Sequence, residues 1–430
     1  MYWSPLVGQC LQTTPVNHLY SVLESAITVA AQSSKMYRTL SSSHILATLK
    51  LYCDENGLIV NTLKTKILAC RASGRMSRKP YSFFYKGQKI EIVKSCMYLG
   101  IPFTTSTAGT MATDMAVKKA KIASNVVLNT LSKLKSDTWN SKIKIFNSMV
   151  KSTLTYQAHI WGLNQNLLDK LESAHLYFFK RLFSLPKCTP NYALRLELGL
   201  EHILVQVIKN ACRWIIRVLK MPDSRLPKIC LLRLCESQSY SEEKFNWLLR
   251  LRALLKPINE DSMLDNLSLS VWLNRTEIIV NKYKLYCRQL DANRYAQSSI
   301  LQLTRTSLWP PARLLHICPH NLAKSKIQLR LACTLAFNIS INRTIYRFKP
   351  DKICTQCHRF QEETVIHLLA ECPCYERLRL KYLQQWIIDE DNYNLLTILE
   401  EDSLNSTKAL FSFLTDVVKL RNNNSSPLNT

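Results

Sequence analysis

The stretch Cys354-Thr355-Gln356-Cys357, followed after nine residues by His367 and after four more by Cys372, is the most informative part of this chain. Cys-x-x-Cys places two thiolates on one tight turn, and a His and a Cys five positions apart can reach the same point from a short helix and its exit. Three sulfurs and one imidazole complete a tetrahedral zinc shell with no open position, which is typical of a structural site. We therefore expect structural Zn²⁺ here, although Cys374 or His358 could replace one of the four ligands.

The charge balance points to a polyanionic partner. The chain has 430 residues, of which 47% are hydrophobic, so it can build more than one core. It carries 57 Lys and Arg against 31 Asp and Glu, a net charge of +26. A chain this basic repels itself unless a polyanion is near, so we expect it to bind RNA or DNA in a salt-sensitive manner.

The cysteines and the hydropathy pattern bear on the compartment. The chain contains 15 cysteines, and those outside the Cys/His run show no paired spacing, which is unusual for a secreted protein. No run of about 18 apolar residues predicts a membrane span, and the N-terminus lacks the basic region of a signal peptide. We expect an intracellular protein, in the nucleus or cytoplasm, without a membrane partner.

The hydrophobic periodicity predicts a mainly α protein with a small antiparallel β region. A helix is expected over 44–60 with its end at Asn56-Gly57. Short strands are expected at 64–70, 81–85, 89–93 and 96–103, with Lys86-Gly87 as a hairpin turn. After Thr110 the period changes to about 3.6, which predicts helices through to about residue 348.

Several motifs, in order along the chain, resemble a known family. The Cys/His run, with Glu363-Thr364 before His367 and Cys372-Pro373 after it, resembles the C-terminal zinc knuckle of non-LTR (LINE-like) retrotransposon reverse transcriptases. Other segments resemble the palm, the primer-grip hairpin and the helical thumb of these enzymes: Tyr52-Cys53 to Lys64-Thr65, Tyr98-Leu99-Gly100, Leu154-Thr155-Tyr156 to Trp161-Gly162, and Phe179-Lys180-Arg181-Leu182.

The resemblance implies a division into six segments. These are an irregular segment 1–43, a partial palm 44–108 with the primer-grip-like hairpin, a thumb-like helical domain 109–225, a helical connector 226–348, the zinc knuckle 349–385 and a helical or disordered tail 386–430. We expect the knuckle to have little core of its own, so that bound zinc would order it.

The acidic residues that polymerisation needs are not where the resemblance would place them. Reverse transcription uses two Mg²⁺ ions, which are held by carboxylates. The family's paired aspartates precede the palm helix, where this chain reads Ser34-Lys35-Met36-Tyr37-Arg38-Thr39-Leu40-Ser41. We therefore assign no catalytic residues, expect Mg²⁺ only in a complete parent enzyme, and expect a truncated element that does not polymerise alone. No nucleophile elbow or P-loop motif suggests another enzyme class.

Candidate nucleic-acid contacts come from the resemblance and from basic residues on predicted helices. Lys64 would lie near the leaving pyrophosphate, and Tyr98, Leu99 and Gly100 near the primer backbone. The basic residues opposite the apolar stripes could follow phosphates. They are Lys118, Lys119, Lys121, Lys142, Lys144, Lys151, Lys180 and Arg181.

Three interpretations remain open on the sequence. The first is the C-terminal part of a non-LTR retrotransposon reverse transcriptase that retains a nucleic-acid-binding thumb and zinc knuckle. The second is a non-enzymatic, zinc-containing RNA- or DNA-binding protein derived from such an element. The third is a decayed fragment without function, whose exposed strand edges would make it poorly soluble.

Overall fold

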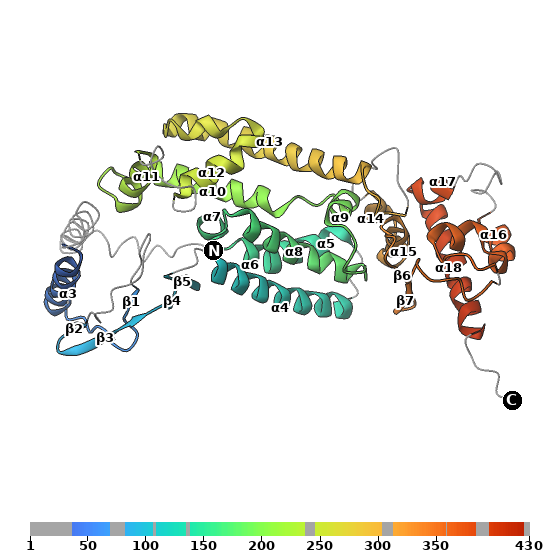
Figure 1. The fold of residues 1–430 in the computed structure, drawn as a ribbon, viewed down its shortest axis with the longest axis horizontal. Coiled ribbons are helices and arrows are strands. Elements are labelled where there is room, and N and C mark those ends of the chain that lie inside the picture. Colours follow the sequence, from blue (N-terminus) through green and yellow to red (C-terminus); the bar gives the residue numbers. More distant parts are fainter. Residues whose placement is uncertain are drawn as a thin grey trace. The chain divides into compact units, whose positions relative to one another are not determined.

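The computed structural model describes residues 37–68, 82–105, 109–134, 138–236, 246–302, 313–357, 359–383 and 395–424. The chain divides into two compact units, one of Met1–Ala112 with Met221–Arg233 and the other of Thr113–Lys220 with Leu234–Thr430. Figure 1 shows their elements. Most of the expected segment 1–43, and the end of the expected tail from 425, lie outside the described residues. The six-segment division remains a prediction.

The first unit begins with the helix α3 (Tyr37–Glu55), which ends as the sequence predicts. Gly57 has a φ of +62°, and the Leu58 N–H donates to the Cys53 carbonyl at 2.8 Å. This six-to-one hydrogen bond and the left-handed glycine form a Schellman motif, which satisfies a carbonyl at the end of the helix.

Two hairpins and one parallel pairing form the β part of this unit. The strands β2 (Phe83–Tyr85) and β3 (Gln88–Val93) pair antiparallel around Lys86-Gly87. Both turn residues have positive φ, as a type I′ turn requires. The strands β4 (Ser95–Tyr98) and β5 (Ile101–Thr104) form a second antiparallel hairpin. The strand β1 (Lys66–Leu68) pairs with β3 in parallel, in contrast to the antiparallel region that the sequence predicts.

Helices make up most of the second unit, which confirms a mainly α fold. Those before the Cys/His run are α4 (Thr110–Leu134), α5 (Trp139–Phe146), the π-helix η2 (Asn147–Lys151), α6 (Ser152–Thr155), α7 (Ala158–Trp161), α8 (Gln165–Leu182), α9 (Asn191–Leu198), α10 (Ile203–Leu219), α12 (Trp247–Leu255), the short 3₁₀ turns η4 (Lys256–Ile258) and η5 (Asp261–Leu264), α13 (Leu269–Ala296), α14 (Arg313–Ile317) and α15 (His320–Arg330). Helix α11 (Leu226–Glu236) spans the division between the units, and α4 also begins just before it.

Aromatic rings fill the centre of the second unit around α5 and α8. The Phe146 ring lies 4.8 Å from Phe178 and 4.6 Å from Phe179, and Trp139 lies 6.1 Å from Phe179. His175 is 3% exposed and its ring lies 5.4 Å from Phe146. It is therefore a packed histidine of this core.

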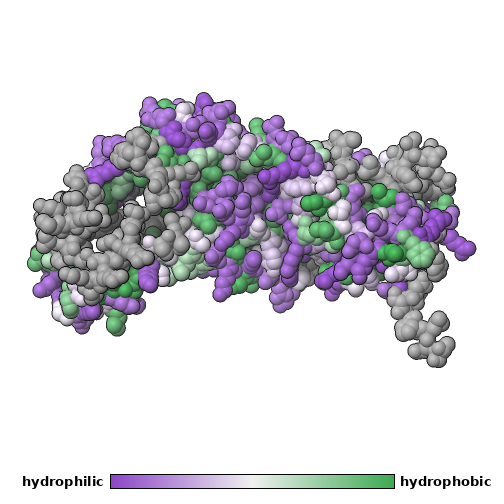
Figure 2. Space-filling view, viewed as in Figure 1, coloured by the Kyte–Doolittle hydropathy of each residue, from purple (hydrophilic) through white to green (hydrophobic). Residues whose placement is uncertain are grey.

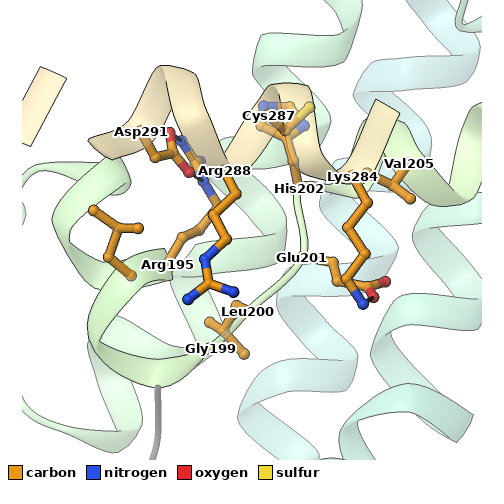
Figure 3. A pocket seen from close by; sticks show the side chains of 11 residues that line it. Arg195, Gly199, Leu200, Glu201, His202, Val205, Lys284, Cys287, Arg288 and Asp291 are labelled. Atoms are coloured by element: carbon orange, nitrogen blue, oxygen red, sulfur yellow. Dashed lines mark hydrogen bonds and ion pairs between the residues drawn. The ribbon is translucent and has the colours of Figure 1, made fainter. Parts of the chain in front are cut away.

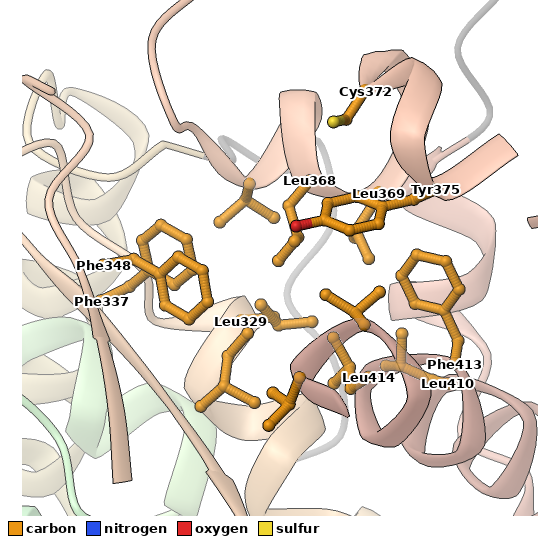
Figure 4. Close-up of a cluster of buried hydrophobic side chains, with 14 of the residues drawn as sticks. Leu329, Phe337, Phe348, Leu368, Leu369, Cys372, Tyr375, Leu410, Phe413 and Leu414 are labelled. Atoms are coloured by element: carbon orange, nitrogen blue, oxygen red, sulfur yellow. The ribbon is translucent and has the colours of Figure 1, made fainter. Parts of the chain in front are cut away.

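The C-terminal lobe of the second unit combines a hairpin with helices. Its remaining elements are β6 (Phe337–Ile341), β7 (Thr344–Phe348), the π-helix η6 (His367–Glu371), the 3₁₀ turn η7 (Pro373–Tyr375), α16 (Glu376–Tyr382), α17 (Leu395–Glu400) and α18 (Leu404–Asn424). One buried cluster joins them, and Figure 4 shows side chains of β6, β7, η6 and α18 meeting in it. The Cys/His region thus packs into a core that it shares with β6, β7 and α18, which the sequence did not predict.

Two predicted helical regions are interrupted. The chain from 337 to 348 forms the β6–β7 hairpin, whose turn residues Asn342 and Arg343 have positive φ. The helical region expected after Thr110 also breaks after Thr155, where Gln157 has a φ of +54°. Gly162 follows, and a Cβ at this position would lie 2.7 Å from the Ala158 carbonyl oxygen, so only glycine fits there.

Arg330 connects the helical body with the C-terminal lobe. Its side chain is 2% exposed and donates to Glu197 Oε1 of α9 at 3.0 Å, and to the Leu399 carbonyl and Asp402 Oδ1 at 2.7 Å. Nearby, the buried Lys326 ammonium donates to the Glu401 carbonyl and to Ser406 Oγ. Lys326 and Arg330 of α15 thus hold the connection between α17 and α18.

We predict that Arg330→Met destabilises the protein by roughly 3–5 kcal/mol, because two buried carboxylates would lose their ion pair with the guanidinium. Chemical denaturation followed by circular dichroism measures this change. Arg347→Met on the exposed side of β7 is the control and should change stability by less than about 0.5 kcal/mol. Equal effects of the two substitutions would contradict a connecting role for Arg330.

Candidate metal centre

A loop whose two ends are hydrogen-bonded to each other positions Cys354 and Cys357. The Glu363 N–H donates to the Lys352 carbonyl and the Cys354 N–H to the Gln361 carbonyl, both at 2.9 Å. The chain therefore enters and leaves the loop side by side. Within the loop, the Gln356 N–H donates to the Cys354 sulfur at 3.4 Å, which favours the thiolate over the thiol.

A π-helical turn positions the other two residues. Residues five apart lie about 140° apart around an α-helix, so His367 and Cys372 would face different directions on one. In η6 the Cys372 N–H instead donates to the His367 carbonyl at 2.8 Å, which closes the turn over five residues and brings both onto one side. Thr364 Oγ1 accepts from the His367 N–H at 3.0 Å and caps the turn.

Together the loop and the turn bring the four predicted ligands to one point. The three sulfurs and one imidazole nitrogen all lie within 4.8 Å of one another, and all four residues are buried. Cys357 Sγ lies 3.5 Å from His367 Nε2. This buried Cys₃His group could hold a metal ion. Within the described residues it is the one such group of three or more His, Cys, Asp or Glu side chains.

The two alternative ligands differ from this group. Cys374 is exposed, and its sulfur contacts the Gln356 carbonyl at 2.8 Å instead of joining the four. His358 lies outside the described residues. The structure therefore favours Cys372 over Cys374.

The pKa values of Cys354 and Cys372 favour the binding of a cation between their sulfurs. A hydrogen bond with Cys372, together with the nearby backbone N–H groups, lowers the pKa of Cys354 to about 4, although burial opposes this. The same contact with Cys354 raises the pKa of Cys372. The two sulfurs thus disfavour losing both protons in the absence of a cation, and a bound cation would favour two thiolates.

Neighbouring residues orient the ligands. His367 Nε2 faces the sulfurs, while Nδ1 lies 3.6 Å from Glu371 Oε2. A carboxylate at this position favours a proton on Nδ1, which leaves Nε2 free for a metal. On the other side of the loop, Glu363 forms an ion pair with Arg421 of α18. The Arg421 guanidinium also lies 4.7 Å from the Phe348 ring, so α18 and β7 support the loop.

The predicted nucleic-acid contacts of the first unit lie on its surface. Lys64 is exposed in the turn before β1. Leu99 and Gly100 form the two-residue turn between β4 and β5, with φ of +49° and +79°. Tyr98 and Leu99 are 63% and 60% exposed, and the Tyr98 ring contacts Phe103. These side chains are available to a ligand.

The basic residues of the second unit have different environments. Lys118, Lys119 and Lys121 are exposed on α4. Lys180 is partly buried, and its ammonium donates to the Lys187 and Thr189 carbonyls at 3.1 and 2.6 Å. It therefore holds a loop together.

Lys142 and Lys144 differ in solvent exposure although they are only two residues apart. Lys142 is 3% exposed and cannot follow phosphates as predicted, whereas Lys144 is exposed. Lys151 is half-buried, and burial lowers its pKa.

Tyr177 of α8 brings two of the predicted cations together. Lys121 Nζ lies 5.8 Å and Arg181 Cζ 5.9 Å from the centre of its ring, and the Tyr177 hydroxyl lies 3.3 Å from Asn125 Oδ1. These four residues, from the neighbouring helices α4 and α8, are called the Tyr177 cluster below. The helical spacing of Tyr177 predicts a core residue, whereas its side chain is partly exposed. The four-residue spacing of Tyr177 and Arg181 on one helix was the available signal that they lie together.

A cavity of about 80 Å³ lies between α9, the start of α10 and α13 (Figure 3). Arg195 beside it donates to both oxygens of Asp291, at 2.7 and 2.5 Å, and to Glu172 at 2.7 Å. Burial would raise the pKa of Glu172, but His175, His202 and Arg195 hold it well below its usual range. These buried ion pairs connect α8, α9 and α13, which is a structural role.

The described residues include no helix that is both long and apolar enough to cross a membrane. Hydrophilic side chains cover much of the face shown in Figure 2, with smaller hydrophobic patches between them.

Comparisons with known proteins identify no relative. The chain matches no protein-family model, no curated protein and no solved structure. The functional conclusions therefore rest on the residues and their geometry.

We predict that the chain binds one metal ion through this group. Titration with Co²⁺ should give the visible absorption of a tetrahedral thiolate complex with one equivalent bound. Cys357→Ser and Cys372→Ser should weaken binding at least about tenfold. Cys374→Ser is the matched control and should bind normally, because the Cys374 sulfur lies outside the group. Loss of binding in Cys374→Ser with retention in Cys372→Ser would show that Cys374 is the fourth ligand.

Proposed function

We propose that this protein binds RNA or DNA through basic helices of its second unit, and that a structural zinc ion stabilises its C-terminal lobe. The observation that carries the proposal is the Tyr177 cluster, where two cations lie against one partly exposed ring. In the described part of the chain, neither Lys121 nor Arg181 forms an ion pair with an acidic residue.

The cluster suits a phosphate backbone. Two unneutralised cations within about 12 Å of each other repel, and an anion placed between them relieves that repulsion. Lys118 and Lys119 extend the positive charge along α4, and the net charge of +26 adds long-range attraction. Contacts of this kind neutralise phosphates and release counterions, so they supply affinity with little sequence preference.

Zinc is the ion that best fits the Cys₃His group. Three thiolates and an imidazole are soft and borderline ligands, which zinc binds in a tetrahedral arrangement. In such a complex the sulfur and the nitrogen lie about 3.5 Å apart, and the Cys357 to His367 distance is 3.5 Å. Four protein ligands leave no open position for a substrate, so the role that fits is structural.

We also propose that the chain is related to non-LTR retrotransposon reverse transcriptases. The support for this relation is the order of the sequence motifs, the exposed Tyr98-Leu99 turn and the Cys₃His group near the C-terminus. We propose binding without polymerisation, either as part of such an enzyme or as a binding protein derived from one, in the nucleus or cytoplasm.

We predict that the zinc-loaded protein binds labelled oligonucleotides of about 20 nucleotides, with affinity that falls steeply between about 50 and 200 mM salt. Fluorescence anisotropy on single-stranded RNA, single-stranded DNA and duplexes measures this. The double substitution Lys121→Gln with Arg181→Gln should reduce the slope of log affinity against log salt by about 1.5, since two phosphate contacts are lost.

The matched control for binding is Lys256→Gln with Arg294→Gln. It removes the same charges from exposed residues that have no ion pair among the described residues. It should lower affinity slightly through net charge and leave most of the salt slope intact. Equal slopes for the two double variants would show that charge alone, and not the Tyr177 cluster, governs binding.

A primer-extension assay separates binding from polymerisation. With a primed template, nucleotides and Mg²⁺ or Mn²⁺, we expect no incorporation above background, because two-metal chemistry needs clustered carboxylates. Robust incorporation would overturn this half of the proposal while leaving nucleic-acid binding in place.

A further inference from the structure

Two cysteines outside the metal centre are far apart in the sequence but in contact within the second unit. Cys188 lies in the loop between α8 and α9, and Cys333 in the turn between α15 and β6, 145 residues later. Their sulfur atoms are 3.4 Å apart. Cys188 is exposed, while Cys333 is fully buried. We propose that this pair is an oxidation site, at which a peroxide-class oxidant converts the two thiols into a disulfide that links the loop to the turn.

The backbone on both sides is already held in place. The Lys180 ammonium donates to the carbonyls of Lys187 and Thr189, the two neighbours of Cys188. On the other side, the Thr334 N–H donates to the Ile300 carbonyl at 2.7 Å, and the Gln302 side chain donates to the Cys333 carbonyl at 3.0 Å. The disulfide needs the sulfurs to approach by about 1.4 Å, to a bond of about 2.05 Å, which side-chain rotation can supply.

The reaction balances with one peroxide. The exposed Cys188 sulfur attacks hydrogen peroxide and becomes a sulfenic acid, with release of water. The Cys333 sulfur then attacks the Cys188 sulfur and displaces the hydroxyl group, which leaves with the Cys333 proton as a second water. Two thiols are oxidised, one peroxide is reduced, and Cys333 gives up its contact with the Ala336 carbonyl.

The arrangement of the two cysteines favours disulfide formation more than the initial oxidation of Cys188. Burial and the neighbouring Cys333 raise the pKa of Cys188 to about 11, so little thiolate is present at neutral pH. Once Cys188 is oxidised, however, the partner sulfur is already in contact with it. The expected product under sustained oxidation is therefore the intramolecular disulfide and not a mixture of higher sulfur oxides.

The test treats the full-length, zinc-loaded protein with hydrogen peroxide, followed by alkylation, non-reducing digestion and mass spectrometry. We expect one linked peptide pair containing Cys188 and Cys333, and a rise in Tm of about 5 °C that dithiothreitol reverses, because the link closes a long loop. Cys188→Ser should abolish both results. Cys230→Ser removes another exposed thiol and should change neither.

The experiment has outcomes that overturn the proposal. Cys188 recovered as sulfinic or sulfonic acid without the linked peptide would do so. Links confined to Cys354, Cys357 and Cys372 with release of zinc would also do so. Cys188→Ser alters an exposed side chain and leaves the buried Cys333 in place, so its Tm with and without peroxide can be compared directly with that of the unsubstituted protein.

Discussion

Three parts of the second unit meet at the guanidinium of Arg330. A fully buried cation is costly unless each of its hydrogen-bond donors finds an acceptor. Here the acceptors come from Glu197 on α9, from the Leu399 carbonyl at the end of α17 and from Asp402 before α18. The departure of any one of these segments would remove an acceptor from this buried guanidinium. The metal centre depends on this contact indirectly, because α18 supports its loop through Arg421 and Glu363.

Local patterns in the sequence were sufficient for much of the fold. The stop of α3 at Asn56-Gly57 and the Lys86-Gly87 turn follow from backbone conformations that glycine permits, so the sequence predicts them well. The β6–β7 hairpin was missed because Asn342-Arg343 lacks glycine, although Phe337, Ile339 and Ile341 alternate toward the core. The parallel pairing of β1 with β3 joins distant segments, which no local pattern encodes.

The metal ligands could be predicted from the sequence, whereas the contacts that support them could not. Spacing alone predicted Cys354, Cys357, His367 and Cys372, because ligand chemistry restricts which residues can meet around an ion. The supporting contacts were not predictable, since α18 approaches from a different part of the chain. Charge placement was partly predictable. Helical periodicity predicts that Lys121 and Arg181 are exposed. It does not predict that Lys180 donates hydrogen bonds to loop carbonyls or that Lys142 is buried.

The π-turn at His367 and Cys372 has a consequence for how such centres are found. An α-helix brings residues three or four apart onto one face, so a version of this segment one residue shorter could present the same two ligands on an ordinary helix. The extra residue is absorbed by the widened turn and not by the coordination. A search that fixes the number of residues between the last two ligands would treat the two versions as unrelated, although they could surround the same ion. Length variation within the motif is thus compatible with one coordination geometry.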